Sequence, residues 1–489
     1  MAISSTTKDL PNGPKSELVQ TDKNANFIGW YTATSISQSS GAVVEPYLPL
    51  FAQSLGANNS QIGFLAGLFS LINISQIIWA QLSVKFGNNK FFVFFGQILT
   101  ALIFIPISIL RFGHFLILLL LRFFQSLFNS ATIPSLATLK SDYITDQERA
   151  SKITKFTYLG LIGSFTGTIV GGLIFDFLNS DPSKPESYSL IFLFTALVGI
   201  IGSVIFFFSV PNSTNIPIIK GTITPISFIN HNLTYNKSKI PFHKKINGYL
   251  KKFKSFWIFT IFGIMFYFGV YTVSPFFIII EINYFKFSFL QSSILTSISI
   301  VAQVSISILL ARLNLMNVYG RKPFLLIGVF LIALFTILFG IPYYFITVLT
   351  PDELFIYCFF IWIVLGLGWG LFNSTIAVLL LDIAHPQYRS LLIAVFNSLM
   401  GIVMFLGPVS GGFLIDATDN LFLPFIIRFL IVGFALIYLW KEVDEPVISG
   451  IDLKPLKNVF PFFARMSSAR GPELELAYGN EKLVRKKHL

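Results

Sequence analysis

The residues with the clearest chemical potential are a glutamate and an arginine inside long apolar segments. Glu45 lies about six residues before the end of the segment 27–51, and Arg122 lies about eight residues after the start of 114–138. A charged side chain at the centre of a bilayer costs about 2.5–3.5 kcal/mol, so each needs a partner or water. If the segments are antiparallel membrane helices, a rise of about 1.5 Å per residue gives both charges similar depths. We therefore predict a Glu45–Arg122 ion pair.

Two roles are open for this predicted pair. Protonation of Glu45 would remove its charge and favour one conformation over another, which couples proton movement to a structural change. Alternatively, the pair is permanent and fixes the register of two helices. Arg428 also lies in an apolar segment and has no evident partner. Asp176, Glu281 and Asp416 are expected at outer helix ends, in contact with water.

Other kinds of site have little support. A single cysteine, Cys358, excludes an internal disulfide and a thiol-based metal site, and the five histidines have no ligand spacing. The Gly-x-x-x-x-Gly-Lys-Ser/Thr loop that binds nucleotide phosphates is missing. We expect no enzyme activity, no cofactor and no metal site.

The composition indicates which elements hold these charges. Of 489 residues, 54% are hydrophobic and 12% are charged, whereas soluble proteins have about 25% charged residues. Apolar runs of about 20 residues can cross a hydrocarbon core of ~30 Å as helices. We predict an all-α integral membrane protein with twelve transmembrane helices, at 27–51, 61–83, 91–112, 114–138, 153–176, 188–210, 256–280, 288–311, 323–349, 355–381, 390–414 and 422–440.

The positive charges predict the orientation in the membrane. The net charge is +12, and 30 of the 35 Lys and Arg residues lie in or beside the tails and loops on one side. Cytoplasmic loops are enriched in these residues, so we expect both termini in the cytosol and a location in the cell (plasma) membrane. The first 26 residues have no apolar core, and no cleavable signal peptide is expected. A nucleic-acid partner is not expected either.

A repeat indicates two related halves. Asp142–Asp176 and Asp382–Asp416 align without a gap at an offset of 240 residues and are identical at 12 of 35 positions. Seven of these identities are Asp, Gln, Arg or Gly, which are scarce in apolar helices. Secondary transporters contain such repeats and bind substrate between them. We predict two six-helix bundles related by pseudo-two-fold symmetry, with a cytosolic tail at 1–26, bundles at 27–210 and 256–440, a basic cytosolic linker at 211–255, and a cytosolic tail at 441–489.

Several short motifs resemble the major facilitator superfamily, and the resemblance covers about 27–440. Trp79–Lys90 reads WAQLSVKFGNNK and is similar to the family's Gly-x-Leu-x-Asp-Arg-x-Gly-Arg-Lys loop, but Val84 replaces the aspartate. The matching second-half loop NLMNVYGRKP keeps Gly-Arg-Lys, and Arg122-x-x-Gln125 is similar to the family's Arg-x-x-Gln-Gly. With Val84, gating is either weakened or maintained by Asp142 and Glu148. The resemblance implies cytosolic gate loops, in which we single out Lys85, Gly87, Asp142, Arg149, Gly320, Arg321, Asp382 and Arg389.

The resemblance also implies that spans one, four, seven and ten line a central cavity. Each carries a polar or aromatic stripe on one helical face, although aromatic stripes also serve packing. Polar groups at bilayer depth need partners or water. Together with one residue of span eight, the predicted cavity residues are Thr34, Gln38, Gln125, Asn129, Tyr267, Tyr271, Gln303, Trp362, Trp369 and Asn373.

These features predict a secondary transporter that moves a small solute by alternating access, coupled to protons. One alternative is a drug or lipophile exporter working as a proton antiporter, although Thr168 replaces the proline of the antiporter motif. Another is a transporter-fold sensor that no longer moves solute. We expect a monomer in a lipid bilayer, with a small molecule and H⁺ as partners.

Overall fold

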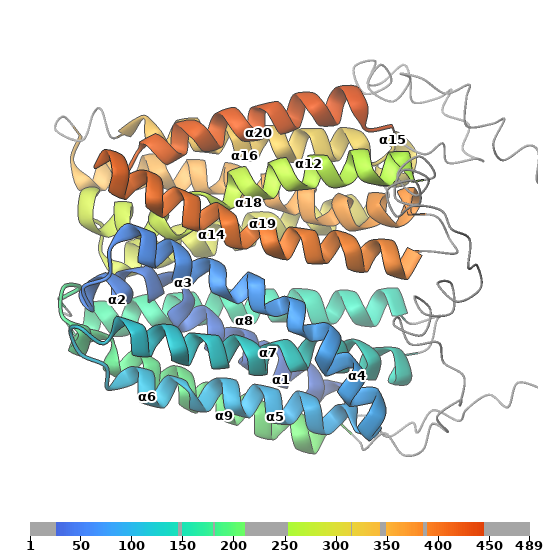
Figure 1. Ribbon diagram of the computed structural model, residues 1–489, viewed down its shortest axis with the longest axis horizontal. Helices are drawn as coiled ribbons and strands as arrows, with labels where there is room; N and C mark the ends of the chain where they lie inside the picture. Colours follow the sequence, from blue (N-terminus) through green and yellow to red (C-terminus); the bar gives the residue numbers. More distant parts are fainter. Residues whose placement is uncertain are drawn as a thin grey trace, which may run out of the picture.

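The computed structural model describes residues 26–144, 149–178, 181–210, 253–313, 315–342, 349–384 and 389–444. Nearly all of the predicted tails and of the basic linker lie outside these residues. The described chain is helical and contains no strand. Figure 1 shows its helices running along the long axis in two groups, the first half in blue to green and the second in yellow to red.

The first half consists of α1 (Phe27–Val44), η1 (Glu45–Tyr47), α2 (Leu48–Ser54), α3 (Asn59–Ile72), η2 (Asn73–Ser75), α4 (Gln76–Phe86), α5 (Asn89–Leu102), α6 (Phe104–Ser108), α7 (Phe115–Tyr143), α8 (Arg149–Phe177), η3 (Pro185–Tyr188) and α9 (Ser189–Ser209). The second half consists of α12 (Lys254–Tyr271), η4 (Ser274–Phe276), α13 (Phe277–Ile279), η5 (Ile280–Tyr284), α14 (Phe289–Arg312), α15 (Leu315–Tyr319), α16 (Lys322–Gly340), α18 (Pro351–Ile383), α19 (Arg389–Thr418) and α20 (Leu423–Glu442).

The number of spans agrees with the prediction. Eleven helical stretches of the described chain are long and apolar enough to cross a membrane. The remaining span is α1 with η1 and α2, which is less apolar because α1 carries many Ser, Thr and Gln side chains. The start of α1 and the end of α20 lie at one end of the molecule, called here the near end (Figure 1). The α2–α3 and α19–α20 connections lie at the opposite, far end.

The first helix of each half is interrupted at a proline. Helix α1 passes into the 3-10 turn η1 at Pro46, and α12 is followed by the 3-10 turn η4 with Pro275. Proline lacks an N–H group and cannot continue the α-helical hydrogen bonding. In the second half the chain then forms a π-helical turn, η5, and such turns are frequent at functional sites.

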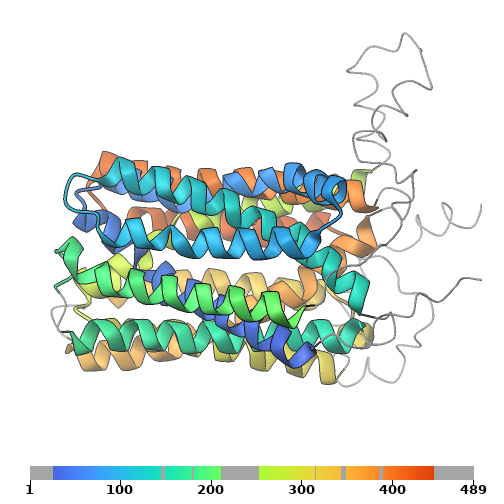
Figure 2. The same ribbon diagram turned by 90° about the horizontal axis from the view of Figure 1, so that it is seen from below.

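Equivalent glycines pack the two halves in the same way. Figure 2 shows α1, in dark blue, crossing the green helices α8 and α9. At this crossing Gly171 of α8 faces the carbonyl oxygen of Val43, and an added Cβ would lie only 2.6 Å from that oxygen. Its repeat equivalent, Gly411 of α19, lies in the same way against the main chain of Thr272. Glycine permits this close approach of helices, so these repeated glycines maintain the scaffold.

Candidate functional site

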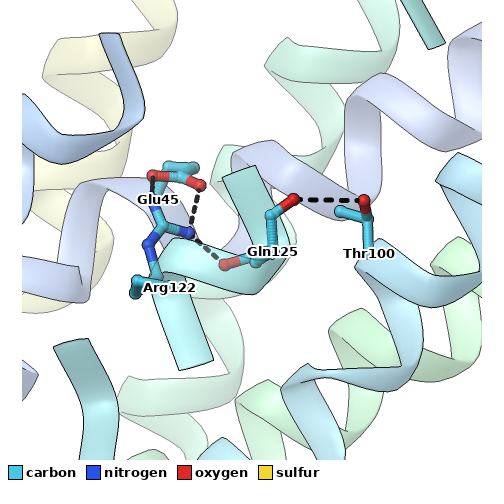
Figure 3. Close-up of polar contacts among 4 residues, drawn as sticks. All are labelled: Glu45, Thr100, Arg122 and Gln125. Carbon is cyan, nitrogen blue, oxygen red and sulfur yellow. Dashed lines mark hydrogen bonds and ion pairs between the residues drawn. The ribbon is translucent and has the colours of Figure 1, made fainter. Parts of the chain in front are cut away.

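Glu45 and Arg122 form a bidentate ion pair (Figure 3). Nη1 of Arg122 lies 3.0 Å from Oε1 of Glu45, and Nη2 lies 3.1 Å from Oε2. Nη1 also donates to Oε1 of Gln125 at 2.6 Å, one turn further along α7. The hydroxyl of Thr100 lies 3.5 Å from the main-chain oxygen of Gln125. Two parallel charge-assisted hydrogen bonds make this one of the stronger kinds of polar contact.

The two partners differ in exposure. The Arg122 side chain is 4% exposed, whereas the Glu45 side chain is 46% exposed. The arginine is thus held inside the protein by two acceptors, while the carboxylate faces open space. A proton can therefore reach Glu45 without any movement of Arg122.

A cavity of about 1140 Å³ lies between the two halves. Glu45 and Arg122 line it from the first half, and Glu281 lines it from the second. It extends to Lys140 in the last turn of α7, toward the near end. Of the predicted cavity residues, those that line it are Gln38, Gln125, Asn129, Tyr271 and Trp362.

The other predicted cavity residues do not line this space, namely Thr34, Tyr267, Gln303, Trp369 and Asn373. Tyr267 and Trp369 pack edge-on against Phe372, with ring centroids 5.7 and 5.5 Å away. The Thr34 hydroxyl donates to the carbonyl oxygen of Trp30 in its own helix, at 3.0 Å. For the two aromatic residues, the stripe seen in the sequence serves helix packing in the second half.

Two aspartates join the halves at the far end. Asp176, in the last turn of α8, accepts from the backbone N–H groups of Phe289 and Leu290 at 3.1 and 3.3 Å. Asp416, near the end of α19, accepts from the backbone N–H groups of Asn59 and Ser60 at 3.2 and 2.8 Å. The Asn59 and Ser60 side chains donate to it as well. Each carboxylate thus caps the start of a helix in the other half, α14 or α3, where its charge also complements the helix dipole.

Two further contacts accompany these caps. The hydroxyls of Tyr47 and Ser293 are in direct contact, and the side-chain amide of Asn283 donates to Oε1 of Gln53 at 3.1 Å. The two aspartate caps and these two contacts together are called the far-end seam. The sequence led us to expect Asp176 and Asp416 only in contact with water, and did not predict that they join the halves in the far-end seam. For Glu281 the expectation is wrong, because that residue is only 1% exposed.

Comparison with known proteins identifies the family. The sequence profile described as Major Facilitator Superfamily matches residues 30–314 and 259–470. The chain belongs to the major facilitator superfamily. A transporter of Methanocaldococcus jannaschii, described as an uncharacterised MFS-type transporter, is 24% identical over 415 residues, covering 81% of this chain and 92% of that one. The chain is therefore a multi-pass membrane protein of this superfamily.

Other relatives match less of the sequence or the fold alone. The multi-drug resistance efflux pump PmrA of Streptococcus pneumoniae is 25% identical over 158 residues, covering 30% of this chain and 37% of the pump. A point mutant of the nucleoside transporter NupG has a TM-score of 0.66 at 14% identity, covering 84% of this chain and 98% of that one. A D-xylose-proton symporter has a TM-score of 0.65 at 12% identity, covering 86% of this chain and 98% of that one. These structures support the superfamily's twelve-helix fold.

The superfamily's loop motifs lie at the near end. Gly87 ends α4 with a φ of 64°, one of the few backbone positions that require glycine, and exposed Lys85 precedes it. Gly320 has a φ of 85° in the second-half loop, and the following Arg321 pairs with Asp382 at the end of α18. This ion pair joins two elements of the same half. The side chains of Asp142, Arg149 and Arg389 lie outside the described residues, so the cytosolic gate remains a prediction.

Proposed function

We propose that the protein moves a small solute across the cell membrane by alternating access, with proton coupling at Glu45. The bidentate pair between a half-exposed carboxylate and a buried arginine is the observation that carries the coupling. An ion pair with both partners buried would be inaccessible to protons, and one with both exposed would have little effect on conformation.

The arrangement of contacts supports alternating access. The far-end seam holds the halves together at one end, and the cavity between them extends to the near end. The distribution of Lys and Arg favours a cytosolic near end. On this assignment the structure represents the state in which the cavity communicates with the cytosol and the extracellular end is closed.

The proton step follows from the pair's geometry. Protonation of Glu45 would leave the buried Arg122 with neutral acceptors alone in this contact, Gln125 and the uncharged carboxyl of Glu45. A buried charge that loses its counter-charge is destabilised, and the half-exposed position of Glu45 reduces the cost below that of a fully buried pair. A rearrangement that gives Arg122 water or a new acceptor is then favoured. The helix break at Pro46, next to Glu45, provides a place where the backbone can adjust.

The cavity wall suits a neutral or amphipathic solute. The charge of Arg122 is already balanced by Glu45, and much of the wall is formed by Phe, Tyr, Ser, Gln and Asn residues. A phosphate or other organic anion would require free cationic groups, and among the described residues the one additional cation in this wall, Lys140, lies at its near-end margin. Export of a drug-like compound is the second candidate, favoured by the partial similarity to a multi-drug efflux pump.

Transport by purified protein in liposomes tests this proposal. The probes are a radiolabelled nucleoside, xylose and ethidium, and the driving force is an imposed pH gradient. We expect one probe to move with the gradient, and Glu45→Gln to abolish accumulation while retaining solute exchange without a gradient. Glu186→Gln is the matched control, because Glu186 is exposed and pairs with Arg111 away from the cavity. Accumulation that stays proton-driven in Glu45→Gln would assign the pair a purely structural role.

A further inference from the structure

The second half contains a buried acid that the coupling at Glu45 does not use. Glu281 lies in the π-helical turn η5, is 1% exposed and forms part of the cavity wall. Its Oε1 has no hydrogen-bond partner among the described residues. Buried polar groups are nearly always paired, so a buried carboxyl with an unpaired oxygen calls for a functional explanation.

The polar neighbours of this carboxyl are neutral hydrogen-bond donors. The Ser292 hydroxyl of α14 and the Trp362 indole N–H of α18 lie close enough to this carboxyl to interact with it. Neither group has a completed hydrogen bond within the described chain. Trp362 also lies 240 residues after Arg122, the same offset that relates the two copies of the repeat. Where the first half supplies a cation to its acid, the second half supplies a neutral donor.

The other ionisable groups around Glu281 leave its charge unbalanced. Cys358 of α18 and Tyr47 of η1 are close enough to interact electrostatically, and both are neutral in their ordinary form. Asp176 of α8, which also faces Tyr47, is acidic. Arg428 of α20 lies over the Phe277 ring, 5.3 Å from its centroid, and forms no ion pair with Glu281 in the described chain. An ionised Glu281 would therefore be a buried, uncompensated charge.

A proton fits this environment better than any larger occupant. The accessible area of Oε1 is almost zero, which leaves no room for an amine group. A metal cation needs several oxygen ligands, whereas the Trp362 indole N–H is a donor only. A proton takes no volume and converts the carboxylate into a neutral group that can remain buried.

The burial of Glu281 depends on contacts of the far-end seam. Asn283, two residues further on, is bonded across the seam to Gln53. Tyr47 contacts Ser293, the neighbour of Ser292, from the first half. Separation of the halves at the far end would remove both Gln53 and Tyr47 from this region and admit water.

We propose that Glu281 is a second proton-binding site, which keeps its proton while the far-end seam is closed and exchanges it with the far side when the seam opens. The transport role of this site rests on the proposed function. The binding of the proton does not, because it can be measured without any solute.

Infrared spectroscopy of the purified full-length protein tests the inference. At pH 7.5 we expect a protonated-carboxyl C=O band that shifts in D₂O, persists in Glu45→Gln and Glu186→Gln, and is lost in Glu281→Gln. In the Asp176→Ala/Asp416→Ala protein, whose seam is weakened, the band should decrease at pH 7.5 and recover on acidification. Thermal unfolding verifies that each variant is folded, and the Gln substitution preserves the shape of the side chain.

Two results would overturn the inference. A band unchanged in Glu281→Gln would show that Glu281 is ionised or bound to another cation. A band lost in Glu281→Gln but unaffected by the seam variant would remove the link to far-end opening. Neither result bears on the transport test of Glu45→Gln, so failure of one proposal is distinguishable from failure of the other.

Discussion

Replacing Asp416 with alanine should shift the protein toward opening at the far end. Asp416 accepts four hydrogen bonds from the start of α3, two from backbone N–H groups and two from side chains. Loss of a helix N-cap costs about 0.5–2 kcal/mol, and loss of the charge at the helix dipole costs about 0.3–1 kcal/mol. Because Asp416 is exposed, water replaces part of this interaction. We expect a net shift of about 1–2 kcal/mol, which is a 5- to 30-fold change in the open-to-closed ratio.

Spin labels across the far end measure this ratio. Lys184 and Asp352 are exposed far-end residues of different halves and can be replaced by labelled cysteines, while the native Cys358 is buried. Pulsed electron resonance should show a longer-distance population that grows in Asp416→Ala. Asp181→Ala is the matched control, because Asp181 caps Ser183 within its own loop. Identical distance distributions in Asp416→Ala and the parent protein, or an equal change in Asp181→Ala, would refute the assigned role of the seam.

Three further substitutions probe the seam, the ion pair and a helix start. Gly172→Ala places a Cβ against Ser293 across the seam, which should destabilise the closed state by about 1–3 kcal/mol and enlarge the open population in the same distance measurement. The control is Gly433→Ala, whose added Cβ meets no neighbour and should leave the distances unchanged. Arg122→Lys loses the bidentate geometry and should reduce proton-driven uptake in liposomes at least as strongly as Glu45→Gln. Uptake by Arg122→Lys equal to that of the parent protein would show that a positive charge alone suffices. Thr350→Ala removes the capping box of α18 and should destabilise the protein by about 1 kcal/mol in thermal unfolding, without changing the distance distribution.

The spans were predictable because each depends on a local property. A run of about 20 apolar residues must cross the membrane as a helix whatever surrounds it, since the backbone has no other way to satisfy its hydrogen bonds. The approach of Glu45 to Arg122 was predictable for a similar reason, because depth along a straight helix follows from residue counting.

The environment of other residues depends on packing between distant segments and could not be obtained in this way. Glu281 is near the end of an apolar run, which favoured a solvated position, but the π-helical turn and α14 bury it. Tyr267 and Trp369 have the spacing of a cavity wall, yet their rings face other aromatic side chains. Spacing determines which residues share a helix face. It does not determine which neighbour that face meets.

The repeat separates the residues that maintain the scaffold from those that differ between the halves. Its shared glycines Gly171 and Gly411 pack α8 on α1 and α19 on α12, and its shared aspartates Asp176 and Asp416 form the reciprocal caps of the far-end seam. The position occupied by Arg122 in the first half is occupied by Trp362 in the second, and each lies beside an acid close to a proline helix break, Glu45 directly before Pro46 and Glu281 six residues after Pro275. Arg122 can compensate a full negative charge, whereas the indole of Trp362 can offer only a hydrogen bond. The two acids therefore differ in the charge state that their surroundings support, and a cycle that opens the far end would expose Glu281 without requiring Glu45 to leave its arginine.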